Sequence, residues 1–215
     1  MDSDLAIKIC GMKQLANIAE VACLRPDYLG FICWQGSPRY VAHDLTSAAL
    51  DSLGVGARRV GVFVNPNLNE LERWIEQLGL SVIQLHGDES VEFCQNIRAA
   101  LSAIEIWKAF PIGDHLPEVI SYQRVIDRVL FDTSSALRGG SGKTFNWDML
   151  KSYRSEIPLT LSGGLSVENL PAAIAAGRGV ISMVDLNSKV ESAPGVKNLD
   201  LCRRAIAIVR EDRSV

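Results

Sequence analysis

The chain has 215 residues, a formal net charge of −3 and 47% hydrophobic residues. A chain of this size buries roughly 70% of its unfolded surface, and α/β barrels of this length often form one domain. No apolar run is long enough to span a membrane and no basic block is present, so we expect neither a membrane nor nucleic acid as a partner.

Cysteine usage and the N-terminus indicate the compartment. The five cysteines are widely spaced, odd in number and without a C-x-x-C pair, which is typical of reduced thiols in a cytoplasmic protein. The first residues are acidic and do not look like a signal peptide. The three histidines, His43, His86 and His115, are not spaced as metal ligands, so we expect no metal site.

Short β-branched or apolar runs alternate with longer amphipathic stretches along the chain. We predict strands over residues 5–10, 28–33, 59–64, 82–85, 104–109, 129–132, 159–161 and 179–184. We predict helices that begin near Lys13, His43, Asn67, Ser90, Leu116, Trp147, Ser166 and Asn198. Strict alternation of this kind predicts parallel strands joined by crossover helices, closed as one (β/α)8 barrel domain over residues 1–215. An open doubly wound sheet is the alternative.

Polar residues and glycines gather directly after the predicted strands, where the active sites of such barrels lie. Two glycine-rich segments follow the sixth and seventh strands, Gly139 to Gly142 and Ser162-Gly163-Gly164. Glycine lets backbone N–H groups approach an anion closely, and the helix predicted at Ser166 would add a favourable dipole. This pattern favours a phosphate site over plain tight turns.

Cys10 and Asp132 end the first and sixth predicted strands, roughly across the barrel mouth from one another. Lys8 lies on the same side of its strand as Cys10, so its ammonium would favour a thiolate able to accept a proton. Asp132 is suited to donate or accept a proton. A small buried hydrophobe and a loop cap are the structural alternatives for Cys10 and Asp132.

Arg39 and His86 also follow predicted strands. The planar guanidinium of Arg39 suits a carboxylate, and a surface ion pair is the alternative. His86 would either contact substrate or orient its loop.

The motifs of this sequence resemble those of a known family, the phosphoribosylanthranilate isomerases. Each motif is weak alone, but the series follows the family's order and covers nearly the whole chain: Lys8-Ile9-Cys10-Gly11-Met12, Gly30-Phe31, Ser37-Pro38-Arg39-Tyr40-Val41, Val60-Gly61-Val62-Phe63-Val64-Asn65, Ile83-Gln84-Leu85-His86-Gly87-Asp88-Glu89, Leu130-Phe131-Asp132-Thr133, Gly139 to Asn146-Trp147, Leu161-Ser162-Gly163-Gly164-Leu165, Val190-Glu191 and Pro194-Gly195-Val196-Lys197.

The resemblance implies an Amadori rearrangement of N-(5-phosphoribosyl)anthranilate in tryptophan biosynthesis. It makes Asp132 the general acid that opens the furanose ring and Cys10 the general base that removes the C2 proton. Arg39 would hold the anthranilate carboxylate. The expected substrate-binding residues are completed by Lys8, His86, Asp185 and three phosphate-binding loops, at Gly140-Ser141-Gly142, Gly163-Gly164 and Asn187-Ser188. No metal or organic cofactor is implied, and either a monomer or a homodimer is expected.

The loop after the eighth strand departs from the family pattern. Asn187 replaces a serine and Lys189 replaces a glycine of the usual Asp-Val-Ser-Ser-Gly-Val-Glu. Lys189 would either grip the phosphate as a point charge or point to solvent. The competing functions are a catalytically impaired phosphosugar-binding relative and the histidine-pathway isomerase, which performs the same rearrangement with two aspartates.

Overall fold

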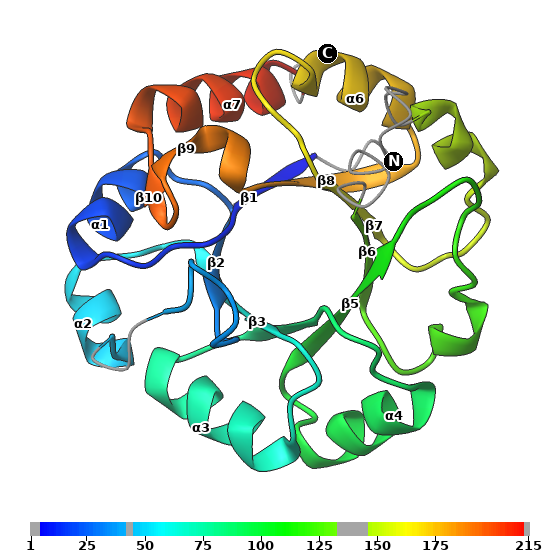
Figure 1. Cartoon of the computed structure of the whole chain (residues 1–215), viewed down its shortest axis with the longest axis horizontal. Coiled ribbons are helices and arrows are strands. Elements are labelled where there is room, and N and C mark those ends of the chain that lie inside the picture. The colour runs from blue at the N-terminus through cyan, green and yellow to red at the C-terminus, as the bar shows by residue number, and fades with distance from the viewer. Residues whose placement is uncertain (1–4, 42–44, 133–145, 213–215) are drawn as a thin grey trace.

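The computed structural model describes residues 5–41, 45–132 and 146–212, and its centre is a closed barrel of eight parallel strands (Figure 1). Their bounds are Ala6–Ile9 (β1), Tyr28–Ile32 (β2), Arg58–Phe63 (β3), Val82–Leu85 (β4), Glu105–Pro111 (β5), Arg128–Asp132 (β6), Leu159–Ser162 (β7) and Ile181–Leu186 (β8). Because β1 pairs with β8, the barrel prediction is confirmed and the open-sheet alternative is wrong.

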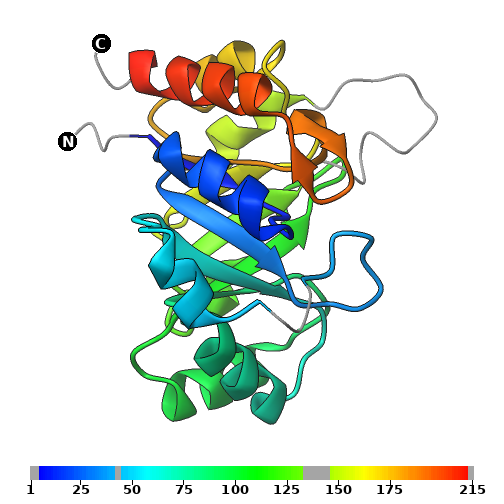
Figure 2. The same cartoon turned by 90° about the vertical axis from the view of Figure 1, so that its left-hand side faces the viewer.

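Helices surround the barrel in Figure 1. The α-helices are Leu15–Cys23 (α1), Ser47–Ser52 (α2), Leu68–Leu78 (α3), Val91–Ala100 (α4), Leu170–Gly177 (α6) and Leu199–Asp212 (α7), and the 3-10 helices are Ile120–Tyr122 (η1), Trp147–Ser152 (η2) and Ser188–Val190 (η3). A short antiparallel hairpin, Glu191–Ala193 (β9) with Val196–Lys197 (β10), follows β8. Figure 2 shows this hairpin at the end of the barrel to which the strands point.

Two helix starts agree with the capping signals in the sequence. Asn67 caps α3, because its side-chain oxygen accepts a hydrogen bond from the Glu70 N–H at 2.9 Å. Asn198 caps α7 by accepting from the backbone of Asp200 and Leu201. Such caps satisfy N–H groups that have no partner inside the helix.

The prediction of a helix start at Ser166 was wrong, since α6 begins at Leu170. Pro171 explains the delay, because proline has no N–H and is tolerated only in the first turn of a helix. The Asn169 side chain instead bridges the preceding turn, accepting from the Ser166 N–H at 2.8 Å and donating to the Gly164 carbonyl at 3.0 Å.

Other boundaries also differ from prediction. The helices expected near Leu116 and Trp147 are only the 3-10 helices η1 and η2. Leu116 precedes a proline, which disfavours helical backbone there. The eighth strand ends at Leu186 and not at residue 184, because backbone pairing with β1 draws Asp185 and Leu186 into the ladder. His43 lies outside the described residues.

The barrel interior changes from apolar to polar along the strands. Near the amino ends, Val60, Val82, Trp107 and Met183 form a fully buried cluster. Successive interior side chains lie two residues apart on a strand, so two residues after Val82 and Met183 come Gln84 and Asp185. These two side chains and Lys8 are buried as well. The apolar cluster therefore closes one end of the barrel beneath a polar layer.

A buried ion pair holds the loop after β4. The Lys108 ammonium lies 3.1 Å from the Glu89 carboxylate, and their side chains are 4% and 1% exposed. Lys108 also donates to the Gly87 carbonyl at 2.8 Å, while Glu89 accepts from the backbone of Asn65 and Gly87. The pair thus fixes the backbone directly after His86.

Lys108→Met leaves the Glu89 carboxylate buried without its counter-charge. Removing one partner of a buried pair costs about 3–5 kcal/mol, and we expect a loss of this size in the free energy of unfolding. Urea denaturation measures it, with Lys151→Met as control because the Lys151–Asp148 pair is exposed. Equal unfolding midpoints for the two variants would contradict the structural role of the pair.

Candidate active site

Lys8 is the centre of the polar layer. Its side chain is fully buried, and its ammonium donates to Gln84 Oε1 and to Asp185 Oδ2, both at 2.8 Å. Burial lowers the pKa of Lys8, but the charges and hydrogen bonds of Asp185 and Cys10 together outweigh it, and the pKa is raised. Lys8 is therefore a charged group that joins β1 to β4 and β8.

Cys10 directly follows β1 and is also buried. Gly30 on β2 makes room for it, since a Cβ on Gly30 would lie 2.7 Å from Cys10 Sγ and 2.9 Å from Lys8 Cε. Burial raises the pKa of the thiol, and the opposing effect of the Lys8 charge is smaller, so the pKa is raised overall. Lys8 thus favours the thiolate as expected, but desolvation has the larger effect on the pKa of Cys10.

Asp132 ends β6 and contacts His86, which follows β4. His86 Nε2 lies 3.2 Å from Asp132 Oδ2, and Gln84 Nε2 lies 3.2 Å from His86 Nδ1. Since Gln84 also accepts from Lys8, a chain of hydrogen bonds runs across the barrel from Asp185 to Asp132. The structure brings four of the predicted site residues together in this way.

Gln84 is the member of this chain to which the sequence analysis assigned no role. It is the one polar residue in β4, whose burial is complete along its length. A glutamine in a short buried strand, two residues before His86, is a signal that a polar partner lies inside the barrel.

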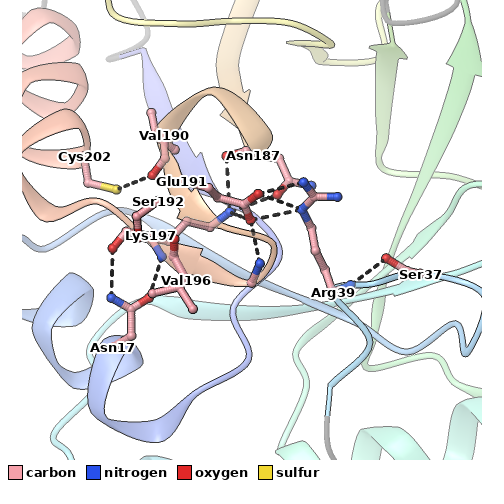
Figure 3. Close-up of polar contacts among 11 residues, drawn as sticks. Asn17, Ser37, Arg39, Asn187, Val190, Glu191, Ser192, Val196, Lys197 and Cys202 are labelled. Carbon is pink, nitrogen blue, oxygen red and sulfur yellow. Dashed lines mark hydrogen bonds and ion pairs between the residues drawn. The ribbon is translucent and has the colours of Figure 1, made fainter.

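Arg39 lies against the β9–β10 hairpin (Figure 3). Its Nε and Nη2 donate to the two oxygens of Glu191 at distances of 2.7–3.0 Å. The ion pair considered as the alternative for Arg39 is therefore present, although it is largely buried: the Arg39 side chain is 20% exposed and that of Glu191 is 4% exposed.

Lys197 extends the same cluster beneath Glu191. Its ammonium donates to Glu191 at 2.7 Å and to the backbone and side-chain oxygens of Asn187 at 3.2 and 2.9 Å. Three acceptors match the three donors of an ammonium group. Burial raises the pKa of Glu191, but hydrogen bonds from Arg39 and Lys197 outweigh it and lower the pKa overall. Two cations and one carboxylate leave the cluster with one net positive charge.

The altered loop after β8 takes a path that suits its residues. Ser188 and Lys189 are exposed and lie in η3. The only non-glycine residues with positive φ in the described part of the chain are Arg25 and Asn65, so Lys189 is not strained. The exposed Lys189 side chain agrees with the solvent alternative, and a phosphate contact by Lys189 remains a prediction.

Gly163 and Gly164 follow β7 with φ of 87° and 67°, a conformation that glycine adopts readily. This backbone suits close approach of an anion, but α6 starts at Leu170, so the α-helix expected directly behind the glycines is missing. Gly140, Ser141 and Gly142 lie outside the described residues. Among the residues that the structure describes, no cluster of three or more His, Cys, Asp or Glu side chains fits a metal ion, and no helix is long and apolar enough to span a membrane.

Fold and site define a (β/α)8-barrel enzyme with a thiol and a carboxyl group at the carboxyl ends of its strands. The family model described as N-(5'-phosphoribosyl)anthranilate (PRA) isomerase matches residues 7–207. The chain therefore belongs to the N-(5'-phosphoribosyl)anthranilate isomerase family.

Individual relatives agree with this assignment. The chain is 35% identical over 207 residues to the N-(5'-phosphoribosyl)anthranilate isomerase of Zymomonas mobilis subsp. mobilis, which covers 94% of this chain and 97% of that protein. The crystal structure of phosphoribosyl anthranilate isomerase from Thermus thermophilus matches with a TM-score of 0.81 and 32% identity, over 96% of this chain and 99% of the other. Another phosphoribosyl anthranilate isomerase structure, in complex with reduced 1-(o-carboxyphenylamino)-1-deoxyribulose 5-phosphate, has a TM-score of 0.72 and 27% identity over the same shares.

Because burial raises the pKa of Cys10, its thiol should resist alkylation at neutral pH. We expect the rate of iodoacetamide modification of Cys10 to rise only above the titration range of an ordinary thiol. Peptide mass spectrometry across a pH series measures this rate, with a free-thiol peptide in the same sample as the control. A Cys10 midpoint at or below that of the free thiol would show that Lys8 outweighs burial after all.

Proposed function

We propose that the chain catalyses the Amadori rearrangement of N-(5-phosphoribosyl)anthranilate to 1-(2-carboxyphenylamino)-1-deoxyribulose 5-phosphate, the isomerisation step of tryptophan biosynthesis. The family membership, and a relative that binds a reduced form of this product, support the reaction. The proposal takes residues 1–215 as one catalytic domain, in the cytoplasm, active as a monomer or homodimer without metal or organic cofactor.

The strand order supports the orientation of the substrate. β7 and β8 lie between β6, which carries Asp132, and β1, which precedes Cys10. A phosphate bound by the backbone of the loops after β7 and β8 would present its sugar between these two side chains. Phosphate binding at those two loops is common in such barrels.

Asp132 would act first, as the general acid. It gives a proton to the furanose ring oxygen, the C1–O bond breaks with its electrons left on that oxygen, and the nitrogen lone pair forms a C1=N iminium. Cys10 then removes the proton from C2. The C2–H electrons form a C1=C2 bond while the iminium electrons return to nitrogen, and the resulting enolamine relaxes to the ketone.

Cys10 would act through its deprotonated fraction, because burial raises the pKa of its thiol. The positive charge of the iminium develops on the carbon next to C2. An adjacent cation favours the thiolate, so the intermediate itself supports the base at the step that needs it.

Two further contacts suit the substrate. The positive charge of the Arg39–Glu191–Lys197 cluster would attract the anthranilate carboxylate, and Arg39 is its most exposed cation. Inside the barrel, no described residue provides a hydrogen-bond partner for the buried Oδ1 of Asp185. A sugar hydroxyl would satisfy that oxygen, since buried acceptors rarely lack a donor.

The catalytic assignment predicts the behaviour of two variants. Cys10→Ala and Asp132→Asn should each lower kcat by ~10²–10⁴-fold, the usual contribution of a general acid or base. A fluorescence assay that follows loss of phosphoribosylanthranilate made in situ measures this, with product-analogue binding as the control for folding. A loss under roughly tenfold in either variant would remove that residue from its role. No turnover by the wild-type chain would instead favour the impaired, ligand-binding alternative.

Arg39→Ala should weaken binding more than it slows chemistry, because the anthranilate carboxylate is remote from the migrating proton. Loss of a charge-assisted contact predicts a KM about tenfold higher or more, with a small change in kcat. Arg58→Ala, at the other end of the barrel and paired with Glu105, is the control. The aniline analogue, which lacks the carboxylate, should lose little further on mutation. An equal loss with both substrates would show that Arg39 acts elsewhere.

A further inference from the structure

The orientation of the Gln84 amide follows from the charge of Lys8. An ammonium group has three donors and no acceptor, so only the carbonyl oxygen of Gln84 can face it. The 2.8 Å contact between Lys8 Nζ and Gln84 Oε1 has this arrangement. The amide NH2 of Gln84 is therefore directed away from Lys8, and it lies 3.2 Å from His86 Nδ1.

The same reasoning assigns the proton on His86. An amide NH2 group only donates, so His86 Nδ1 must accept and carries no proton. A neutral imidazole then has its proton on Nε2, and an imidazolium, with protons on both nitrogens, would set two donors against each other. His86 Nε2 lies 3.2 Å from Asp132 Oδ2, so its N–H is directed at the carboxyl group.

We propose that Gln84 holds His86 in the neutral Nε2–H form, and that His86 is the positioning residue for the acid Asp132. The N–H of His86 donates to Oδ2 and stabilises the carboxylate that remains when Asp132 has given up its proton. The role of His86 at Asp132 rests on the proposed function, whereas the protonation state of His86 does not. The observation behind both is the hydrogen-bonded chain Lys8–Gln84–His86–Asp132.

Hydrogen bonds also hold the backbone at and beside His86. His86 N–H donates to the Phe63 carbonyl at 2.8 Å, and the next residue, Gly87, is bound on both its N–H and its carbonyl by the buried Glu89–Lys108 pair. The backbone that carries the imidazole is thus fixed, and the contacts with Gln84 and Asp132 orient the ring itself. Such supporting contacts are what hold catalytic groups in a productive geometry.

Two isosteric variants separate the donor from the rest of the histidine. In His86→Gln the side-chain nitrogen takes the place of Nε2 and keeps a donor for Asp132. In His86→Asn the side chain reaches only as far as Nδ1, so it keeps an acceptor for Gln84 and loses the donor. We expect His86→Asn to lower kcat on the order of 10-fold to 100-fold, the range for a hydrogen bond to a charged group, and His86→Gln to recover most of that loss.

Equal losses of kcat in the two variants would overturn the positioning role. Thermal unfolding of both variants shows whether a loss of kcat reflects a loss of stability. We expect similar unfolding temperatures, because each variant keeps one of the two hydrogen bonds. If a variant does not fold, the spectroscopic measurement on the wild-type chain still decides the assignment.

Nitrogen-15 NMR reads the protonation of His86 directly, without substrate. The chain has three histidines, and the His86 signals are identified by their loss in His86→Gln. At neutral pH we expect an unprotonated Nδ1 and a protonated Nε2 in the wild type. In Gln84→Glu the new carboxylate accepts from Lys8 and from the imidazole, so Nδ1 should become protonated. A protonated Nδ1 in the wild type, or no change in Gln84→Glu, would overturn the proposal.

The NMR measurement and the activity assay test different claims. If the NMR result holds and phosphoribosylanthranilate is not consumed, the proposed function is wrong and the protonation of His86 stands. If the substrate is consumed and the NMR result fails, the function stands and the role of Gln84 is wrong.

Discussion

A fully buried ammonium is the group on which the polar interior of this barrel depends. Lys8 cannot leave the protein interior without breaking the packing of β1, so its neighbours must supply oxygens to it. Asp185 compensates its charge, and Gln84 turns its carbonyl inward to meet it. Because a buried ammonium accepts nothing, each group around it has only one workable orientation. In the proposed arrangement the orientation of Gln84 sets that of the His86 imidazole, which in turn donates to Asp132 at the end of β6.

Much of the fold could be predicted from alternation alone. Parallel strands buried on both faces are visible in the sequence as short apolar runs, and capping residues such as Asn67 predict where the following helices begin. The start of α6 shows the limit of that approach, because Ser166 is an acceptable cap and only Pro171, five residues later, excludes a helix that begins there. The 3-10 helices η1 and η2 were missed because one or two turns of apolar periodicity do not distinguish them from α-helices.

The candidate site divides in a similar way. Residues at strand ends, such as Cys10 and Asp132, could be predicted because the barrel itself brings strand ends together. The partner of Arg39 could not, since Glu191 lies 152 positions away and belongs to a hairpin that spans residues 191–197. The protonation of Cys10 could not be predicted either. Sequence spacing places Lys8 beside the thiol, but only the structure shows how completely the pair is removed from water.

The apolar cluster at the amino ends of the strands affects how substrate enters the barrel and how product leaves it. Val60, Val82, Trp107 and Met183 are fully buried and close that end, so in the part of the chain that the structure describes the polar interior faces the carboxyl ends of the strands. Whatever is made inside must leave by the route along which the next molecule arrives. An isomerisation conserves every atom, so the departing molecule keeps the same anionic groups as the arriving one. Product and substrate therefore compete for the same end of the barrel. If the proposed phosphate-binding loops hold the substrate, the balance between entry and exit depends on how they release a phosphate that the reaction leaves unchanged.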